Sequence, residues 1–166
     1  MKFSRILCHL STGRLAVRRL FPASSLTAIE QAIEQSEIGH EGEIRFAVEA
    51  ALNVLPLLRD QSVRERAVEV FSQLRVWDTE HNNGVLIYLL LADHDVEIVA
   101  DRGINGKVGV EEWNRVCREM ETAFRQGRFE SGVIAGIHAV GSHLQRHFLA
   151  GRGGSENELP DTPIIL

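Results

Sequence analysis

Three carboxylates in the middle of the chain are the best candidates for chemistry. Glu49 ends a stretch of alternating residues, and Asp93 and Asp95 follow a run of apolar residues. Ca²⁺ takes about six to eight oxygen ligands in proteins, commonly from carboxylates. If the strands predicted over 43–50 and 84–92 run parallel, their carboxyl ends meet at one sheet edge, where ligands of open α/β sheets bind. We therefore predict that any metal site consists of Glu49, Asp93 and Asp95, with Ca²⁺ as the candidate ion.

Each group of residues that could do chemistry also has a purely structural interpretation. Aspartate is common in surface turns because its carboxylate accepts hydrogen bonds from nearby amides, so Asp93 and Asp95 could be solvated turn residues. His143 and His147 have the i, i+4 spacing of a zinc clamp, but no third ligand is in register, and a helix C-terminus itself favours a cation. The two cysteines form no CxxC pair, and there is no P-loop or CxxxxxR phosphatase signature. The sequence therefore supports neither a zinc ribbon nor a thiol-dependent phosphatase.

Hydrophobic patterning predicts the strands that would hold the carboxylates. Residues 43–50 alternate, which predicts a strand with one better-buried face and with Arg45 and Glu49 on the other face. Residues 85–91 are apolar at every position, as expected of a central strand that is covered on both faces. A short polar link leads to the apolar stretch 96–100, so we predict a hairpin.

Helical spacing and capping residues predict the remaining elements. A capping box begins a helix at Ser62, and Ser24 or Ser25 could cap an earlier one. Gly132, Gly136 and Gly141 in the last helix predict its close approach to a neighbouring element. One helix is predicted over residues 3–21, with a break near 13, and a second begins at 24 or 25 and ends before the loop at 39–42. Three more helices are predicted over or near residues 62–74, 113–127 and 129–148. The order of elements predicts a three-layer α/β/α sandwich around a small mixed sheet of three strands, with a fourth left open.

Charge is distributed unevenly along the 166 residues. The net charge is −5, but residues 1–29 contain five basic residues and no acidic one. We predict a basic helical arm over 1–20, which either packs Leu15, Val17 and Leu20 on the domain or lies on a membrane surface. The acidic remainder would repel a nucleic-acid backbone, so no nucleic-acid partner is expected.

The sequence also gives expectations for targeting segments and for a disordered C-terminal segment. Residues 6–10 are too short and too polar for the apolar core of a signal peptide, and no apolar run is long enough to span a bilayer, so we expect a cytoplasmic protein. Residues 151–166 are Gly-rich and then acidic, which predicts a disordered tail.

Several motifs, in order along the chain, resemble those of the TPM domain family. The resemblance covers about residues 21–149 and includes Trp77 before the first motif. The matching stretches are Asn83-Gly84-Val85-Leu86-Ile87, similar to NGVLL, residues 93–98, similar to DRxVxI, and residues 124–137, similar to FRxGxYxxGxxxGI. This family implies the same α/β/α sandwich. It also implies links to acid phosphatase activity, to calcium binding, and to assembly or maintenance of membrane complexes.

Departures from the family pattern concern its acidic residues. The segment 21–26 lacks the aspartate of the family's DxxGLLS-like start, and 105–110 has Lys107 and no acid where relatives have an LTD-like segment. His94 and Asp95 replace the residues that follow the aspartate of the DRx motif. We therefore predict a non-enzymatic accessory or interaction domain with a protein partner. The alternative is a divalent-metal-dependent acid phosphatase that uses Glu49, Asp93 and Asp95.

Overall fold

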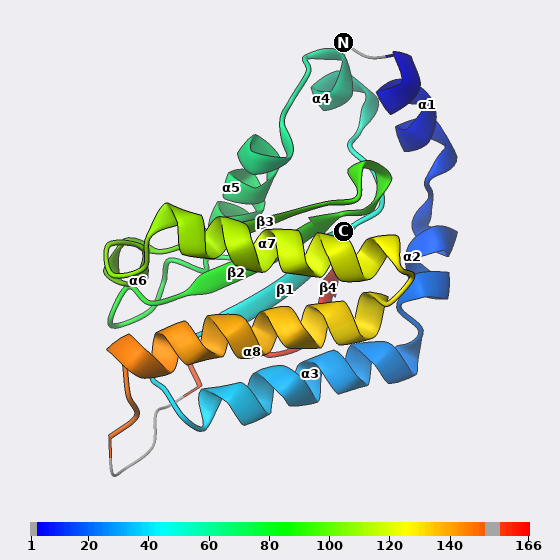
Figure 1. Cartoon of the computed structure of the whole chain (residues 1–166). Coiled ribbons are helices and arrows are strands. Elements are labelled where there is room, and N and C mark those ends of the chain that lie inside the picture. Colours follow the sequence, from blue (N-terminus) through cyan, green and yellow to red (C-terminus); the bar gives the residue numbers. More distant parts are fainter. Residues whose placement is uncertain (1–2, 152–156) are drawn as a thin grey trace.

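A four-stranded mixed sheet forms the middle layer of the molecule (Figure 1). The computed structural model describes residues 3–151 and 157–166. The strands lie in the order β3-β2-β1-β4; β1 is parallel to both neighbours, and β2 and β3 form an antiparallel hairpin. Their bounds are β1 (Ile44–Glu49), β2 (Val85–Leu90), β3 (Asp95–Ala100) and β4 (Ile164–Ile165). The predicted hairpin is confirmed, and the two buried strands run parallel, which was the condition for their carboxyl ends to meet at one edge.

Helices cover both faces of this sheet, which confirms the predicted α/β/α sandwich (Figure 1). One face packs on α5 (Val63–Gln73), and the other packs on α3 (Ala23–Glu37), α7 (Val110–Arg125) and α8 (Phe129–His147). The short elements are α1 (Phe3–Ser11), α2 (Arg14–Leu20), α4 (Val54–Leu58), the 3₁₀ turn η1 (Leu91–Asp93) and α6 (Arg102–Asn105).

The two central strands are buried at every position. This was expected of β2, but β1 was predicted to have one better-buried face, and that prediction is wrong. Ala47, between the polar residues Arg45 and Glu49, belongs to the same apolar cluster as α5, and the last residues of the chain pack against that cluster. The second face of β1 is therefore covered as well.

The end of the chain returns to the sheet. Ile164 pairs with Ala47 of β1, and the two carboxylate oxygens of Glu43 accept hydrogen bonds from the amides of Glu158 and Leu159, each at 3.1 Å. The predicted disordered tail is thus wrong for residues 157–166, and residues 152–156 lie outside the described part of the chain. Strand pairing uses backbone groups, so two isoleucines at the end of a polar, Pro-containing segment can supply the fourth strand.

Local signals placed most helix ends correctly. The capping box is present: the Ser62 side chain accepts from the Glu65 amide, and the Glu65 carboxylate accepts from the Ser62 amide. The arm breaks at Gly13, which is the N-cap of α2. The predicted serine cap of α3 is wrong, because that helix begins at Ala23 and the Ser25 hydroxyl instead donates to Glu130 of α8, at 2.5 Å.

The glycines of α8 allow close helix packing, as predicted. A Cβ atom added at Gly132 would lie 2.8 Å from the Phe124 ring, and one at Gly136 would collide with Met120, both on α7. On its other side, α8 packs against α3, where Gly141 leaves room for Ser36. The helical layer over the sheet is therefore tightly packed.

Candidate functional site

The carboxyl ends of β1 and β2 meet at one edge of the sheet, and α1 lies against this edge (Figure 1). Glu49 is the last residue of β1 and pairs in register with Leu90, the last residue of β2. Leu90 also pairs with Asp95, and Asp93 ends the intervening η1 turn. The three carboxylates predicted from the sequence therefore lie along the same edge.

Glu49 is held by groups of the sheet and of α5. Its side chain is buried, and its two oxygens accept hydrogen bonds from Nε and Nη2 of Arg66, at 2.8 and 3.2 Å. The Tyr88 hydroxyl donates to the same carboxylate at 2.6 Å. Burial and the nearby Glu49 carboxylate raise the pKa of Tyr88, so this hydroxyl stays protonated and remains a donor. Every oxygen of Glu49 thus has a partner within the protein.

Asp93 is held by the arm. Nε of Arg5 lies 3.1 Å from each carboxylate oxygen, and Nη2 donates to Oδ2 at 2.8 Å. Nε2 of His9 lies 3.0 Å from Oδ1, while Nδ1 of the same ring accepts from the Leu52 amide at 3.0 Å. An imidazole nitrogen that accepts a hydrogen bond carries no proton, so His9 donates to Asp93 through Nε2.

These contacts keep Asp93 ionised. Burial raises the pKa of its carboxyl, but the hydrogen bonds from Arg5 and His9 outweigh burial and hold the pKa below its usual value. In turn, the hydrogen bond to Asp93 raises the pKa of Arg5. The pair is charged throughout the physiological pH range.

Asp95 lies in a different electrostatic environment. Its side chain is partly buried, and burial raises the pKa of its carboxyl to about 6, with further contributions from the charges of Glu121, Glu97 and Asp93. Among the described residues, no group of three or more His, Cys, Asp or Glu side chains is arranged to hold a metal ion. The structure thus gives each of the three carboxylates its own surroundings, and the predicted Ca²⁺ site stays a prediction.

Sequence reasoning missed the partners of these carboxylates. Arg66 and Tyr88 gave no signal, because nothing local links them to Glu49. His9 gave a weak one, since it interrupts the amphipathic pattern of the arm and is nonetheless buried. A buried histidine in a short basic helix indicates an acidic partner elsewhere in the chain.

The two histidines with zinc-like spacing line a polar hollow of about 560 Å³. Burial lowers the pKa of His143, whose ring lies edge-on against Trp113 with 5.3 Å between ring centroids. Cationic side chains share the hollow with them: Lys107, Arg115 and Arg146. A zinc site at His143 and His147 remains untested.

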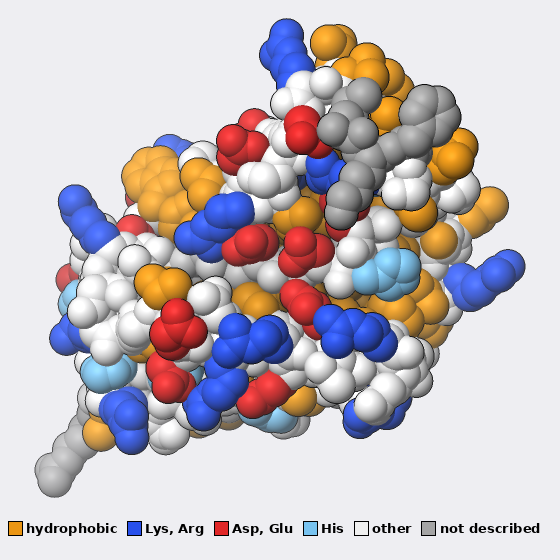
Figure 2. Space-filling view, turned by 45° about the horizontal axis from the view of Figure 1, so that its top comes forward, with side chains coloured by type: hydrophobic (Ala, Val, Ile, Leu, Met, Phe, Trp, Pro, Cys, Tyr) orange, Lys and Arg blue, Asp and Glu red, His pale blue; other side chains and the backbone are white. Residues whose placement is uncertain are grey.

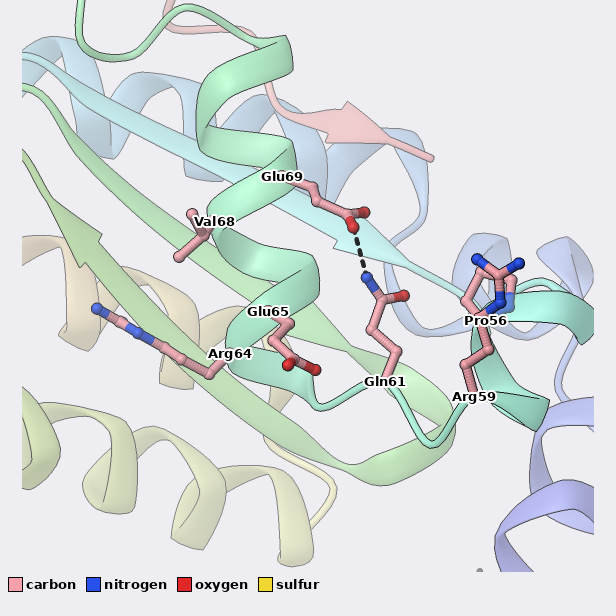
Figure 3. Close-up of a pocket in the computed structure, with 7 residues that line it drawn as sticks. All are labelled: Pro56, Arg59, Gln61, Arg64, Glu65, Val68 and Glu69. Atoms are coloured by element: carbon pink, nitrogen blue, oxygen red, sulfur yellow. Dashed lines mark hydrogen bonds between the residues drawn. The ribbon is translucent and has the colours of Figure 1, made fainter.

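A second hollow, of about 640 Å³, lies between α4 and α5 (Figure 3). Within it, the Gln61 amide donates to the Glu69 carboxylate at 2.6 Å. Its walls mix acidic, basic and apolar side chains: Pro56, Arg59, Gln61, Arg64, Glu65, Val68 and Glu69. The hollow borders the carboxyl edge of the sheet, because the Gln61 carbonyl accepts from Nη2 of Arg5 at 2.9 Å.

The layered fold is that of a known kind of α/β domain. The TPM domain family model matches residues 18–143, and the chain belongs to this family. No helix among the described residues is both long and apolar enough to cross a bilayer.

Solved structures share the fold. The chain is similar to the BA42 protein of the psychrophilic bacterium Bizionia argentinensis, with 32% identity and a TM-score of 0.77, over 88% of this chain and 95% of that one. It also resembles the N-terminal domain of a protein from P. gingivalis, with 19% identity and a TM-score of 0.56, over 71% of this chain and 72% of that one. No curated protein matches the chain.

Proposed function

We propose that this chain is a non-enzymatic TPM-type domain that acts as an accessory module by binding a protein partner. One observation carries the proposal: the strand-end carboxylates Glu49 and Asp93 are each neutralised by a cation of the same chain. A hydrolase needs a free nucleophile, or a metal ion that activates water, together with unoccupied cations for the substrate phosphate. At this edge, Arg5 and Arg66 are already bound to carboxylates.

Other residues support the same conclusion. Burial raises the pKa of the Cys117 thiol to about 12, so it carries no nucleophilic thiolate near neutral pH. The acids that relatives place in the segments 21–26 and 105–110 are missing. A domain that keeps the family fold and lacks these acids retains surfaces that can bind a partner.

One observation favours a second function, that of a divalent-metal-dependent acid phosphatase. Asp93 is held ionised, whereas the pKa of the neighbouring Asp95 is raised to about 6. Two nearby carboxyls with separated pKa values are the usual arrangement for acid–base catalysis. For this function, a metal ion would have to compete with Arg5 and His9 for Asp93.

A hydrolysis assay separates the two functions. The full chain is incubated with p-nitrophenyl phosphate from acidic to neutral pH, with Ca²⁺, Mg²⁺ or Mn²⁺ added in turn. We expect no hydrolysis above the buffer blank that depends on the edge carboxylates. The wild type and the variants Asp93→Asn and Asp95→Asn should therefore give the same rate. The matched control is Asp78→Asn, because Asp78 is an exposed carboxylate away from the sheet edge. A metal-dependent rate that is lost in Asp93→Asn and kept in Asp78→Asn would establish the phosphatase instead.

A further inference from the structure

Helix α1 packs Ile6 on the apolar cluster that contains the α5 side chains, and its other inward side chains are polar. It turns the side chains of Arg5 and His9 inward, toward Asp93, and His9 is only 4% exposed. Leu7 and Leu10 point outward and are 59% and 67% exposed. Helices of soluble domains normally bury the apolar side and solvate the polar one. The hydrogen bonds to Asp93 therefore fix α1 in an orientation that presents leucines to the exterior.

Helix α4 adds a second group of exposed apolar side chains beside α1. Val54, Leu55 and Leu58 are 59%, 65% and 56% exposed. Contacts from α1 to both flanks of α4 place the two helices next to each other. The His9 ring accepts from the Leu52 amide, and Arg5 donates to the Gln61 carbonyl.

We define the α1–α4 surface as the exposed side chains of Leu7, Leu10, Val54, Leu55 and Leu58. In Figure 2, hydrophobic side chains gather at the upper end of the molecule, the end that holds α1 and α4 in Figure 1. Single exposed leucines are common on protein surfaces, whereas a group of them on neighbouring helices marks an interaction site. Some partner is therefore expected to cover this surface.

Cations border the α1–α4 surface and indicate what covers it. Helix α2 continues from α1 and exposes three arginines and Leu15, which is 79% exposed, while α4 is followed by another exposed arginine. The four are Arg14, Arg18, Arg19 and Arg59, and within the described part of the chain none of them forms an ion pair. The nearby acids are Asp60, which is 63% exposed, and Glu65 and Glu69, which line the hollow beside Arg59. A cationic border is unusual on a chain of net charge −5.

We propose that the α1–α4 surface docks on an anionic lipid bilayer. Leucines on one side of a short helix, with arginines on the adjoining segments, are what an interfacial membrane-binding surface needs. The leucines would enter the headgroup region, and the four arginines would lie at the lipid phosphates, each contributing about fivefold in affinity. This inference goes beyond the proposed function, because it names a lipid surface and holds whether or not the domain is catalytic.

Vesicle sedimentation tests the proposal. The full chain is mixed with vesicles of pure phosphatidylcholine or of phosphatidylcholine with phosphatidylglycerol, at low and at high salt. We expect binding to the anionic vesicles that weakens with salt, because exposed charges are screened within a Debye length of about 10 Å at ordinary salt concentrations. Absence of binding to anionic vesicles at low salt, or equal binding to both kinds, would overturn the proposal.

Matched variants locate the surface. Leu55→Ser combined with Leu58→Ser should reduce binding at least about tenfold, since both leucines lose their apolar contact with lipid. The control is Ile38→Ser combined with Leu149→Ser, which removes two apolar side chains elsewhere that are even more exposed, at 79% and 68%. An equal loss in the control pair would overturn the assignment.

A second pair of variants tests the border. Arg18→Gln with Arg19→Gln should also weaken binding at least about tenfold, whereas Arg118→Gln with Arg146→Gln, on α7 and α8, should not. Sedimentation velocity of the same proteins without lipid completes the experiment. Self-association that disappears in the Leu55/Leu58 variant would show that a second copy covers the surface, which would contradict the membrane proposal.

Discussion

Two carboxylates at the same sheet edge are neutralised in different ways. Glu49 receives its cation and its hydroxyl donor from α5 and β2, which belong to the packed interior of the sandwich. Asp93 receives its cation from α1, a nine-residue helix that touches the domain mainly at this edge. Glu49 therefore depends on the fold itself, whereas Asp93 depends on the docking of one short helix. The ion pair of Glu49 with Arg66 is therefore part of the packed fold, whereas the ion pair of Asp93 with Arg5 can open locally.

The largest effect is expected for Arg66→Met. This change leaves Glu49 buried without its cation, and removing one partner of a buried pair costs about 3 kcal/mol of unfolding free energy. Urea unfolding measures the loss. The matched control is Arg64→Met on the same helix, because the Arg64 side chain is 52% exposed and its pair with Glu97 should contribute less than about 1 kcal/mol. Equal losses in both variants would contradict a special role for Arg66.

Asp93→Asn should have a smaller and more local effect. The asparagine keeps the shape but not the charge, so Arg5 loses an ion pair worth about 2 kcal/mol. Because α1 opens separately, we expect faster amide hydrogen exchange in α1 and unchanged exchange in β2. Asp60→Asn is the control, since Asp60 lies 3.6 Å from the same guanidinium and is exposed. Equal acceleration in α1 and β2 would show that the arm and the sheet unfold together.

Asp95→Asn tests the third carboxylate through pH. Its pKa is raised to about 6 in the folded state, chiefly by burial, so the folded protein binds the proton more tightly than the unfolded chain does. This carboxyl therefore lowers the stability of the wild type, relative to the variant, as pH rises from about 4 to about 6. Above this window the variant should be more stable than the wild type by about 1 kcal/mol, and below it the difference should vanish. Urea unfolding of both proteins on both sides of the window measures this, and a difference that does not change across the window would contradict the assignment.

The smallest effect is expected for Leu7→Ser combined with Leu10→Ser. Both side chains are mostly exposed, so the free energy of unfolding should change by less than about 0.5 kcal/mol. Thermal unfolding checks this result. A large loss would mean that these leucines are packed on the domain, which would remove the basis of the α1–α4 surface.

Local patterns predicted most of the fold. The apolar run of β2, the capping box at Ser62 and the break at Gly13 each depend on neighbouring residues, and each prediction was correct. The strand at Ile164–Ile165 was missed, because its pairing with β1 depends on backbone contacts across most of the chain. Local sequence carries no record of such long-range contacts.

The candidate site was only partly predictable for the same reason. The parallel pairing of two strands placed Glu49, Asp93 and Asp95 along one edge, as the strand pattern indicated. The partners of the carboxylates were not predictable, since Arg5 is 88 residues from Asp93, and Arg66 lies on another element, 17 residues from Glu49. Whether a carboxylate can bind a metal ion therefore depends on which side chains already contact it. Those side chains are found only once the fold is known.

An amide-resolved NMR titration with Ca²⁺ tests the central claim, that the strand-end carboxylates are satisfied within the chain. The full-length wild type is compared with the Arg5→Ala variant, in which Asp93 loses its cation, and Mg²⁺ serves as the second ion. We expect small, non-saturating shifts for the wild type at residues 49 and 93–95. Saturable wild-type shifts confined to these residues would contradict this expectation and would establish the metal site.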